Sequence, residues 1–211
     1  SIVLLKNSSP SSQGGDLEPL LPIVKKHKKI ALIGPLVKSV KDHLGFWSYD
    51  WEDDTTRITT LYDAVQKKVN TDTKLLYAKG CNINDKDTAG FAEAVAIANQ
   101  SNIAIIYTGE ERAYSGEAKS KSNIHMPGVQ EELIKAVAAT GKPLIVIIGA
   151  GRPLIFNWTA DNVPSILYTW WLGTKAGDAI ADVLFGEYNP SAKLPMSFPR
   201  SEGQIPIYYN Y

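Results

Sequence analysis

Three glutamates lie close together in one glycine-bearing segment of the sequence. Glu110 and Glu111 follow an apolar run, and Glu117 comes a few residues later, between a glycine and an alanine. A glutamate whose surroundings raise its pKa towards neutrality can protonate a leaving oxygen and later deprotonate water. A glycosidase uses two carboxylates, about 5–5.5 Å apart when the configuration is retained. The segment therefore offers candidates for one of these carboxylates, although its composition is also typical of a solvated charged loop.

Other motifs in the sequence argue against several alternative chemistries. Residues 149–154 begin like a dinucleotide-binding fingerprint, but Leu154 occupies the position of the third glycine. The absence of a Gly-x-Ser-x-Gly motif argues against a serine hydrolase. The single cysteine, Cys81, excludes an internal disulfide framework and a multi-thiolate metal site. The histidines are too scattered for a metal-ligand pattern and are expected at the surface or in loops: His27, His43 and His125. We therefore expect no cofactor and no metal.

The composition argues against nucleic-acid and membrane partners. The 211 residues include 22 Lys and Arg against 22 Asp and Glu, so the formal net charge is zero. A nucleic-acid-binding or polybasic membrane-binding surface would carry a basic excess. The longest apolar run, residues 144–148, is far shorter than the roughly 20 residues needed to span a bilayer. A content of 44% hydrophobic and 21% charged residues suits a globular protein with a sizeable core.

Short apolar runs alternate with helical patterns along the chain, and this order predicts the fold. Five runs without strict alternation are typical of buried strands: residues 29–34, 75–78, 103–107, 144–148 and 166–168. Helical spacing follows at about residues 88–99, after Gly128 and after Gly177. The pattern predicts an α/β sandwich, with a doubly wound, mostly parallel sheet of five or six strands and helices on both faces. Residues 193–198 contain Pro195 and are expected to form an antiparallel edge strand.

The predicted strand order along the chain places the three glutamates at the edge of the sheet formed by the carboxyl ends of the strands. We interpret residues 1–28 as a linker and lead-in segment and residues 29–211 as one α/β sandwich domain. In such a sheet, ligands bind at the carboxyl ends of the strands. The longest connections expected there are residues 36–51 and 110–126, and the second contains all three glutamates. The chain begins with apolar residues, whereas domain termini are usually polar, so we expect that it was cut from a longer protein.

Several blocks of the chain occur in an order that is typical of one protein family. The first blocks are residues 1–7, 30–35, 109–110, 116–118, 140–144 and 151–154. The most specific blocks are residues 179–186, 189–191 and 193–199, and residues 203–209 also fit. Together these blocks resemble the second domain of family-3 glycoside hydrolases, the β-glucosidase group with bacterial periplasmic members. The resemblance covers essentially the whole chain, and it implies an α/β sandwich domain.

The resemblance implies an active site shared between two domains. In the family, an N-terminal barrel carries the nucleophilic aspartate, and the second domain contributes the acid/base glutamate. The family's Gly-Glu-Ala block favours Glu117 for this role, while Glu110, directly after a predicted strand, remains the alternative. Trp47 resembles the family's aromatic residue on the aglycone side, where a ring packs well against a sugar face; the alternative is that it anchors its loop in the core.

Two function classes remain open at this stage. The first is the acid/base domain of a retaining β-glucosidase acting on terminal non-reducing β-D-glucosyl residues of β-linked glucosides or oligosaccharides, in the periplasm or secreted. Its partner is the N-terminal barrel of the same protein, and the isolated chain is expected to be inactive. The second is a non-catalytic sugar-binding or scaffold domain with the same fold.

Overall fold

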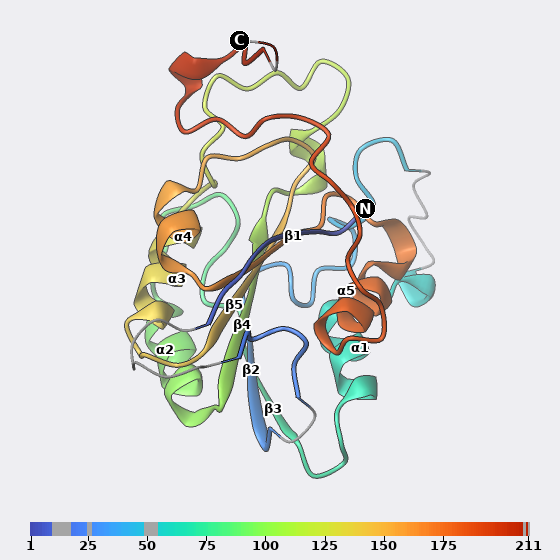
Figure 1. The fold of residues 1–211 in the computed structure, drawn as a ribbon, viewed down its shortest axis with the longest axis vertical. Helices are drawn as coiled ribbons and strands as arrows, with labels where there is room; N and C mark the ends of the chain where they lie inside the picture. Colours follow the sequence, from blue (N-terminus) through green and yellow to red (C-terminus); the bar gives the residue numbers. More distant parts are fainter. Residues whose placement is uncertain (10–17, 25–26, 49–54, 209, 211) are drawn as a thin grey trace.

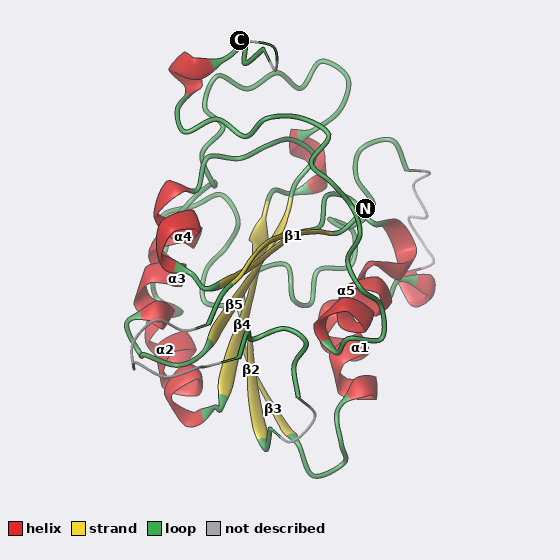
Figure 2. Cartoon of the chain, in the orientation of Figure 1, coloured by secondary structure: helices red, strands yellow, loops and turns green. Residues whose placement is uncertain are grey.

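The computed structural model describes residues 1–9, 18–24, 27–48, 55–208 and 210 of the chain. Within these residues a six-stranded sheet forms the middle layer, and helices pack on both of its faces (Figures 1 and 2). The order of the strands across the sheet is β1-β6-β5-β4-β2-β3. Strands β2 to β6 pair in parallel, and β1 pairs with β6 in the antiparallel direction. The predicted α/β sandwich with a mostly parallel sheet and one antiparallel edge is confirmed.

From the second strand onwards, strands and helices alternate along the chain, as the apolar pattern predicts. The strands are β1 (Val3–Asn7), β2 (Lys29–Ile33), β3 (Lys74–Ala78), β4 (Ile103–Gly109), β5 (Leu144–Gly149) and β6 (Ser165–Tyr168). The α-helices are α1 (Leu61–Lys68), α2 (Phe91–Gln100), α3 (Gln130–Ala138), α4 (Asn157–Asn162) and α5 (Ala176–Leu184). Short 3-10 turns are found at Thr55–Arg57, Arg112–Tyr114, Gly173–Lys175 and Glu202–Gln204.

The sheet separates two hydrophobic cores, each covered by its own group of helices. Helices α1 and α5 pack on one face, and α2, α3 and α4 pack on the other (Figure 1). In strand β2, Ile30 and Leu32 belong to the first core, whereas Ala31 and Ile33 belong to the second. A strand buried on both faces needs apolar residues at every position, which explains the uninterrupted apolar runs of the central strands.

The antiparallel edge strand is β1, and the expectation that residues 193–198 form it is wrong. Those residues adopt no strand, because Pro195 has no N–H to donate to a ladder and β1 already pairs with β6 at that edge. The segment instead crosses the surface, and its Phe198 ring packs edge-on against Tyr168 and Trp170. Residues 3–7 thus contribute a strand to the sheet, while the division of the chain at residue 28 stays a prediction.

A buried histidine lies under the carboxyl edge of the sheet, in a loop, which is one of the two places where the histidines are expected. His43 belongs to the loop after β2, yet its exposed fraction is only 2%. Its ring stacks on Tyr107, with 5.4 Å between the centroids, and its Nδ1 lies 3.2 Å from the Tyr107 hydroxyl. Desolvation by burial lowers the pKa of His43 to about 4, although the charge of Asp42 acts in the opposite direction. His43 is therefore neutral at pH 7.

The depressed pKa of His43 predicts a pH-dependent stability. Between about pH 6.5 and pH 4 the unfolded chain binds a proton at His43 and the folded chain does not, so the free energy of unfolding falls as the pH falls through this window. The slope should be roughly 1.4 kcal/mol per pH unit. Urea unfolding of the wild type and of His43→Gln at pH 7 and pH 5 measures it.

The variant should lose this part of the pH dependence, whatever its absolute stability. His125→Gln is the matched control, because His125 is exposed, and it should keep the pH dependence of the wild type. An equal pH dependence in His43→Gln and the wild type would contradict the assignment of a buried neutral histidine.

Candidate active site

Two loops meet above the carboxyl edge of the sheet. We call residues 36–48, after β2, the tryptophan loop, and residues 110–126, after β4, the glutamate loop; the glutamate loop rises at the top of the molecule in Figure 1. The Asp42 carboxylate of the tryptophan loop accepts a hydrogen bond from the backbone N–H of Arg112 at 3.0 Å. It also accepts one from the Ser39 hydroxyl at 2.6 Å. The two longest connections predicted at this edge are thus joined by a direct hydrogen bond; residues 49–51 of the first lie outside the described residues.

Glu110 is fully buried at the base of the glutamate loop. Its side chain has no exposed surface, and its backbone N–H donates to the carbonyl of Gly149 at 2.9 Å. Its carboxylate lies 3.1 Å from Lys121 Nζ and 3.4 Å from Arg152 Nε. A buried carboxylate is costly unless cations and hydrogen bonds compensate it, and this geometry supplies two cations. Glu110 therefore points into the protein rather than towards a ligand from outside.

Glu117 is exposed at the outer part of the same loop. It lies between two residues with left-handed backbone, Gly116 at φ 154° and Ala118 at φ 58°. A Cβ at position 116 would lie 2.2 Å from the Phe46 ring, so only glycine permits this close approach. A non-glycine residue with positive φ, such as Ala118, is uncommon, and such residues are frequent at functional sites. The backbone on both sides of Glu117 is therefore constrained, while its side chain faces solvent.

Trp47 lies on the surface beside this part of the glutamate loop. Its exposed fraction is 73%, so it is not a core residue. Its ring meets the half-buried Phe46 ring edge-on, with 5.1 Å between the centroids, and Phe46 in turn lies against Gly116. The Phe46 ring therefore links the two loops, with Trp47 on one side and Gly116 on the other. The sequence alone did not identify this role of Phe46, although its position next to Trp47 was a usable signal.

Arg152 is a second residue of this site that the sequence analysis did not identify. It follows β5, the neighbour of β4 in the sheet, and its guanidinium reaches under the glutamate loop. Arg152 Nη2 donates to the carbonyl of Tyr114 and, at 3.0 Å, to that of Lys119. Its Nε faces the Glu110 carboxylate. A cation three residues after a strand end, at the same sheet edge as the glutamates, was the available signal in the sequence.

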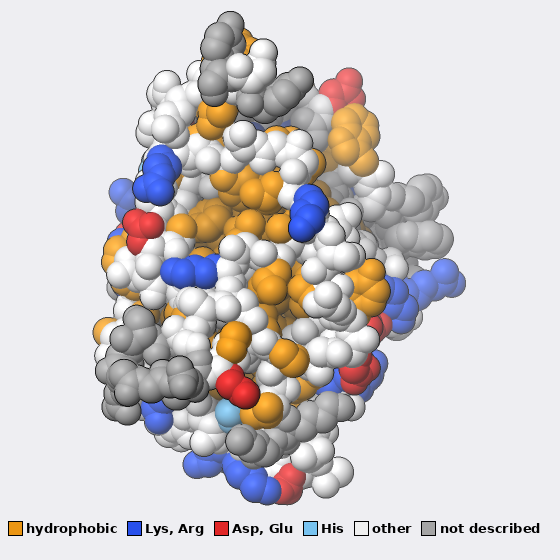
Figure 3. All heavy atoms as spheres, in the orientation of Figure 1, with side chains coloured by type: hydrophobic (Ala, Val, Ile, Leu, Met, Phe, Trp, Pro, Cys, Tyr) orange, Lys and Arg blue, Asp and Glu red, His pale blue; other side chains and the backbone are white. Residues whose placement is uncertain are grey.

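The C-terminal segment carries apolar side chains to the same end of the molecule. The Glu202 carboxylate accepts a hydrogen bond from the backbone N–H of Ile124 at 3.4 Å and lies 3.5 Å from His125 Nε2. The large exposed apolar residues of this segment are Leu194, Met196, Ile205, Ile207 and Tyr208. Hydrophobic side chains also gather in the upper half of the face drawn in Figure 3. This end of the molecule therefore combines the glutamate loop with exposed apolar surface.

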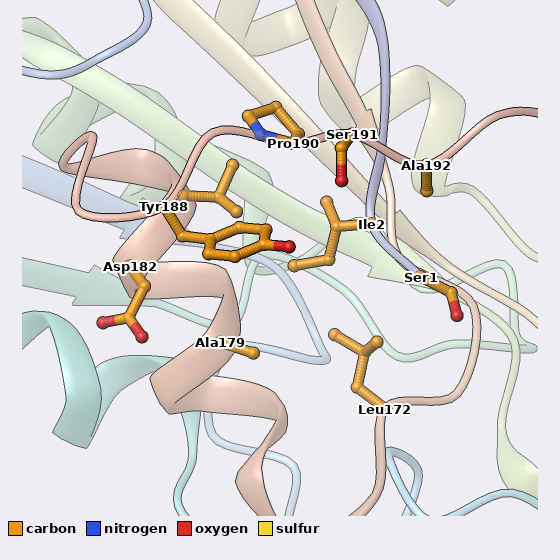
Figure 4. A pocket seen from close by; sticks show the side chains of 10 residues that line it. Ser1, Ile2, Leu172, Ala179, Asp182, Tyr188, Pro190, Ser191 and Ala192 are labelled. Atoms are coloured by element: carbon orange, nitrogen blue, oxygen red, sulfur yellow. The ribbon is translucent and has the colours of Figure 1, made fainter.

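Among the hollows of the described residues, one borders the two loops and another lies at the start of the chain. A groove of about 540 Å³ borders both loops, since Asp42 and Glu111 line it together with Lys38, Tyr77 and Asp85. A cavity of about 300 Å³ lies between the start of the chain, helix α5 and residues 188–192 (Figure 4). No residue of the glutamate loop lines that cavity. The polar groove is therefore the hollow that adjoins the candidate site.

Among the described residues, no group of three or more His, Cys, Asp or Glu side chains could hold a metal ion. Cys81 is buried, and burial raises the pKa of its thiol to about 12. In the same part of the chain, every helix is too short or too polar to cross a membrane.

Comparison with known proteins gives consistent results over the whole chain. Residues 2–211 match the model of the "Glycosyl hydrolase family 3 C-terminal domain". The chain is 41% identical to the periplasmic beta-glucosidase of Salmonella typhimurium, matching 100% of this chain and 29% of that protein. It is 39% identical to a beta-xylosidase of Formosa agariphila, matching 99% of this chain and 28% of that protein. The chain thus spans less than a third of the length of these relatives.

Solved structures show the same likeness in three dimensions. The beta-glucosidase of Listeria innocua, in complex with isofagomine, superposes with a TM-score of 0.87 at 33% sequence identity. The match covers 100% of this chain and 27% of that one.

Proposed function

The chain belongs to glycoside hydrolase family 3 as its C-terminal domain, and from this premise we propose that it supplies the general acid/base, Glu117, to a retaining β-glucosidase. The nucleophilic aspartate comes from a barrel domain that precedes it in the full-length protein. The observation that carries the proposal is the contrast between the two glutamates. Glu117 is exposed on the outer part of its loop, whereas Glu110 is fully buried between two cations.

An acid/base residue that serves a sugar bound on another domain must protrude from its own domain. Glu117 meets this requirement, because it is exposed while its flanking backbone is constrained by the Phe46 ring. Glu110 does not meet it, since no part of its side chain is exposed and the carboxylate is paired with Lys121 and Arg152. The comparison of the two glutamates therefore favours Glu117 as the residue that approaches the substrate.

The proposed reaction proceeds in two steps with a covalent glycosyl-enzyme intermediate. In the first step the aspartate of the barrel attacks the anomeric carbon, and the protonated Glu117 carboxyl donates its proton to the glycosidic oxygen as that bond breaks. In the second step the Glu117 carboxylate removes a proton from water, and the resulting hydroxide displaces the aspartate. Two inversions give net retention of configuration, and Glu117 ends the cycle protonated.

We assign Trp47 to the aglycone side of the substrate. Its indole ring is 73% exposed, and Phe46 joins it to the loop that carries Glu117. An exposed aromatic face can pack against the C–H face of a sugar while the hydroxyls remain solvated. The substrate class is β-linked glucosides or oligosaccharides. Because the relatives include a beta-glucosidase and a beta-xylosidase, the assay must include both glycosides.

The exposed apolar side chains near the glutamate loop support the barrel as the partner. Residues of the C-terminal segment such as Met196 and Ile205 are about half exposed, and large exposed apolar patches are typical of interaction surfaces. A barrel docked there covers them and brings its aspartate towards Glu117. The proposed location is periplasmic or secreted, and it rests on the Salmonella typhimurium relative, a periplasmic beta-glucosidase.

The isolated chain should not hydrolyse aryl β-glucosides or β-xylosides. A single carboxylate cannot both attack the anomeric carbon and protonate the leaving oxygen of a double displacement. Release of the phenol by the purified chain is compared with release by its Glu117→Gln variant, and the two should be indistinguishable. Turnover of the wild-type chain above that of the variant contradicts the division of the active site between two domains.

In the full-length enzyme, Glu117→Ala should lower hydrolysis of substrates with poor leaving groups by about 10²–10⁴-fold, the usual contribution of general acid/base catalysis. The value of kcat/KM for activated aryl glucosides should fall much less, because a phenolate needs little protonation. The second step still lacks its base, so the glycosyl-enzyme should accumulate. Azide needs no base and should restore turnover by forming a glycosyl azide of retained configuration.

Glu110→Ala is the control that separates the two glutamates. Loss of a buried ion-paired residue should damage folding or loop geometry, and azide should not restore the activity. If azide restores Glu110→Ala and not Glu117→Ala, Glu110 is the acid/base residue. If neither variant changes the dependence on the leaving group, the domain acts as the non-catalytic sugar-binding or scaffold alternative.

A further inference from the structure

Three charged side chains form an ion cluster beneath the glutamate loop. Glu110 provides its fully buried carboxylate, and Lys121 and Arg152 provide the cations, at 3.1 Å and 3.4 Å respectively. The Ser115 hydroxyl also lies within 3.4 Å of the Glu110 carboxylate. Removing one partner of a buried ion pair leaves an uncompensated charge, which is strongly unfavourable. The cluster therefore fixes where both cations, and the backbone attached to them, can lie.

Arg152 connects this cluster to the backbone on both sides of Glu117. Before Glu117 its Nη2 donates to the carbonyl of Tyr114 and lies 3.4 Å from Ser115 Oγ. After Glu117 the same nitrogen donates to the carbonyl of Lys119 at 3.0 Å. The planar guanidinium holds several donors in fixed directions, so one side chain holds the two arms of the loop together.

Arg152 is itself fixed to the rigid part of the sheet. Its carbonyl accepts a hydrogen bond from the Tyr168 hydroxyl of strand β6 at 2.5 Å. The neighbouring Gly151 lies so close to the loop that a Cβ there would come within 2.3 Å of Ser115 Oγ. Arg152 therefore ties the glutamate loop directly to strands β5 and β6, in addition to the contacts that join it to the tryptophan loop.

We propose that Arg152 is a positioning residue, which holds the glutamate loop so that the Glu117 carboxyl lies at the glycosidic oxygen. This inference rests on the proposed role of Glu117, and it assigns Glu110 as the counter-ion that keeps the guanidinium in place. Misplacement of a catalytic group by about 1 Å can lower a rate by about 10²-fold. A variant that loses the guanidinium should therefore lose acid/base catalysis while the nucleophile of the barrel remains functional.

The test uses the full-length enzyme with Arg152→Met and, as the control, with Lys74→Met, which removes an exposed cation at the start of β3, at the opposite end of the sheet from both loops. For Arg152→Met, kcat/KM on substrates with poor leaving groups should fall by about 10–10²-fold, and kcat/KM on activated aryl glucosides should fall far less. An activated fluorosugar that traps the glycosyl-enzyme needs no acid, so its inactivation rate should stay within about twofold of the wild type. Lys74→Met should leave all three measurements unchanged.

Arg152→Lys provides the second variant. It keeps a cation beside Glu110 and should fold even where Arg152→Met does not, but an ammonium lacks the planar, multi-donor geometry that holds both arms of the loop. Arg152→Lys should also lower kcat/KM selectively for substrates with poor leaving groups, but by less than Arg152→Met does. If Arg152→Met does not fold, a wild-type dependence on the leaving group in Arg152→Lys overturns the proposal.

A double variant decides whether Arg152 acts through Glu117. In the Glu117→Ala background, Arg152→Met should lower hydrolysis of poor leaving groups by no more than about twofold, because coupled residues are non-additive. The proposal is overturned if Arg152→Met lowers hydrolysis in the Glu117→Ala background as much as it does in the wild type. It is also overturned if Arg152→Met alone slows fluorosugar inactivation as much as it slows hydrolysis of poor leaving groups, or if it slows neither. If Glu117→Ala alone leaves hydrolysis of poor leaving groups unchanged, the proposed function itself fails. If Glu117→Ala lowers that hydrolysis as expected and only the Arg152 variants depart from the expected results, this inference alone fails.

Discussion

The full burial of the Glu110 carboxylate is the constraint on which the arrangement of the candidate site depends. A carboxylate removed from water must be compensated by nearby cations and donors, and Lys121 and Arg152 meet this requirement. Because Arg152 follows the end of β5 and Lys121 lies in the second half of the glutamate loop, the pairing folds the loop back over the sheet edge. Glu117 is then left at the exposed part of the loop.

The two glutamates therefore have complementary parts in the proposed mechanism. Glu110 provides charge that organises the loop and has no access to a ligand, whereas Glu117 has access and contributes little to the packing of its own domain. Phe46 adds a second constraint from the tryptophan loop, since its ring lies against Gly116 and leaves no space for a side chain there. The site thus combines a rigid base with an outward catalytic group, as a site completed by another domain requires.

Much of the fold could be predicted from the sequence, because strands buried on both faces give uninterrupted apolar runs such as residues 103–107 and 144–148. Strand β1 was missed, since its pairing with β6 joins residues far apart in the chain and leaves no local signal. Helix α1 was also missed, although Thr60 and Asp63 cap its first turn. In the site, the resemblance to the family's Gly-Glu-Ala block favoured Glu117. The burial of Glu110 and the contacts of Arg152 with the glutamate loop depend on the tertiary structure, so the spacing of residues in the sequence does not reveal them.

The most direct test of the central claim is the structure of the full-length enzyme with a fluorosugar trapped on its nucleophile. The measurement is the separation between the Glu117 carboxyl and the carboxyl bonded to the sugar. The account predicts about 5–5.5 Å, the separation typical of retaining enzymes, with Glu110 still buried against Arg152. A Glu117 side chain directed away from the sugar, or Glu110 at that separation from the anomeric centre, would contradict it.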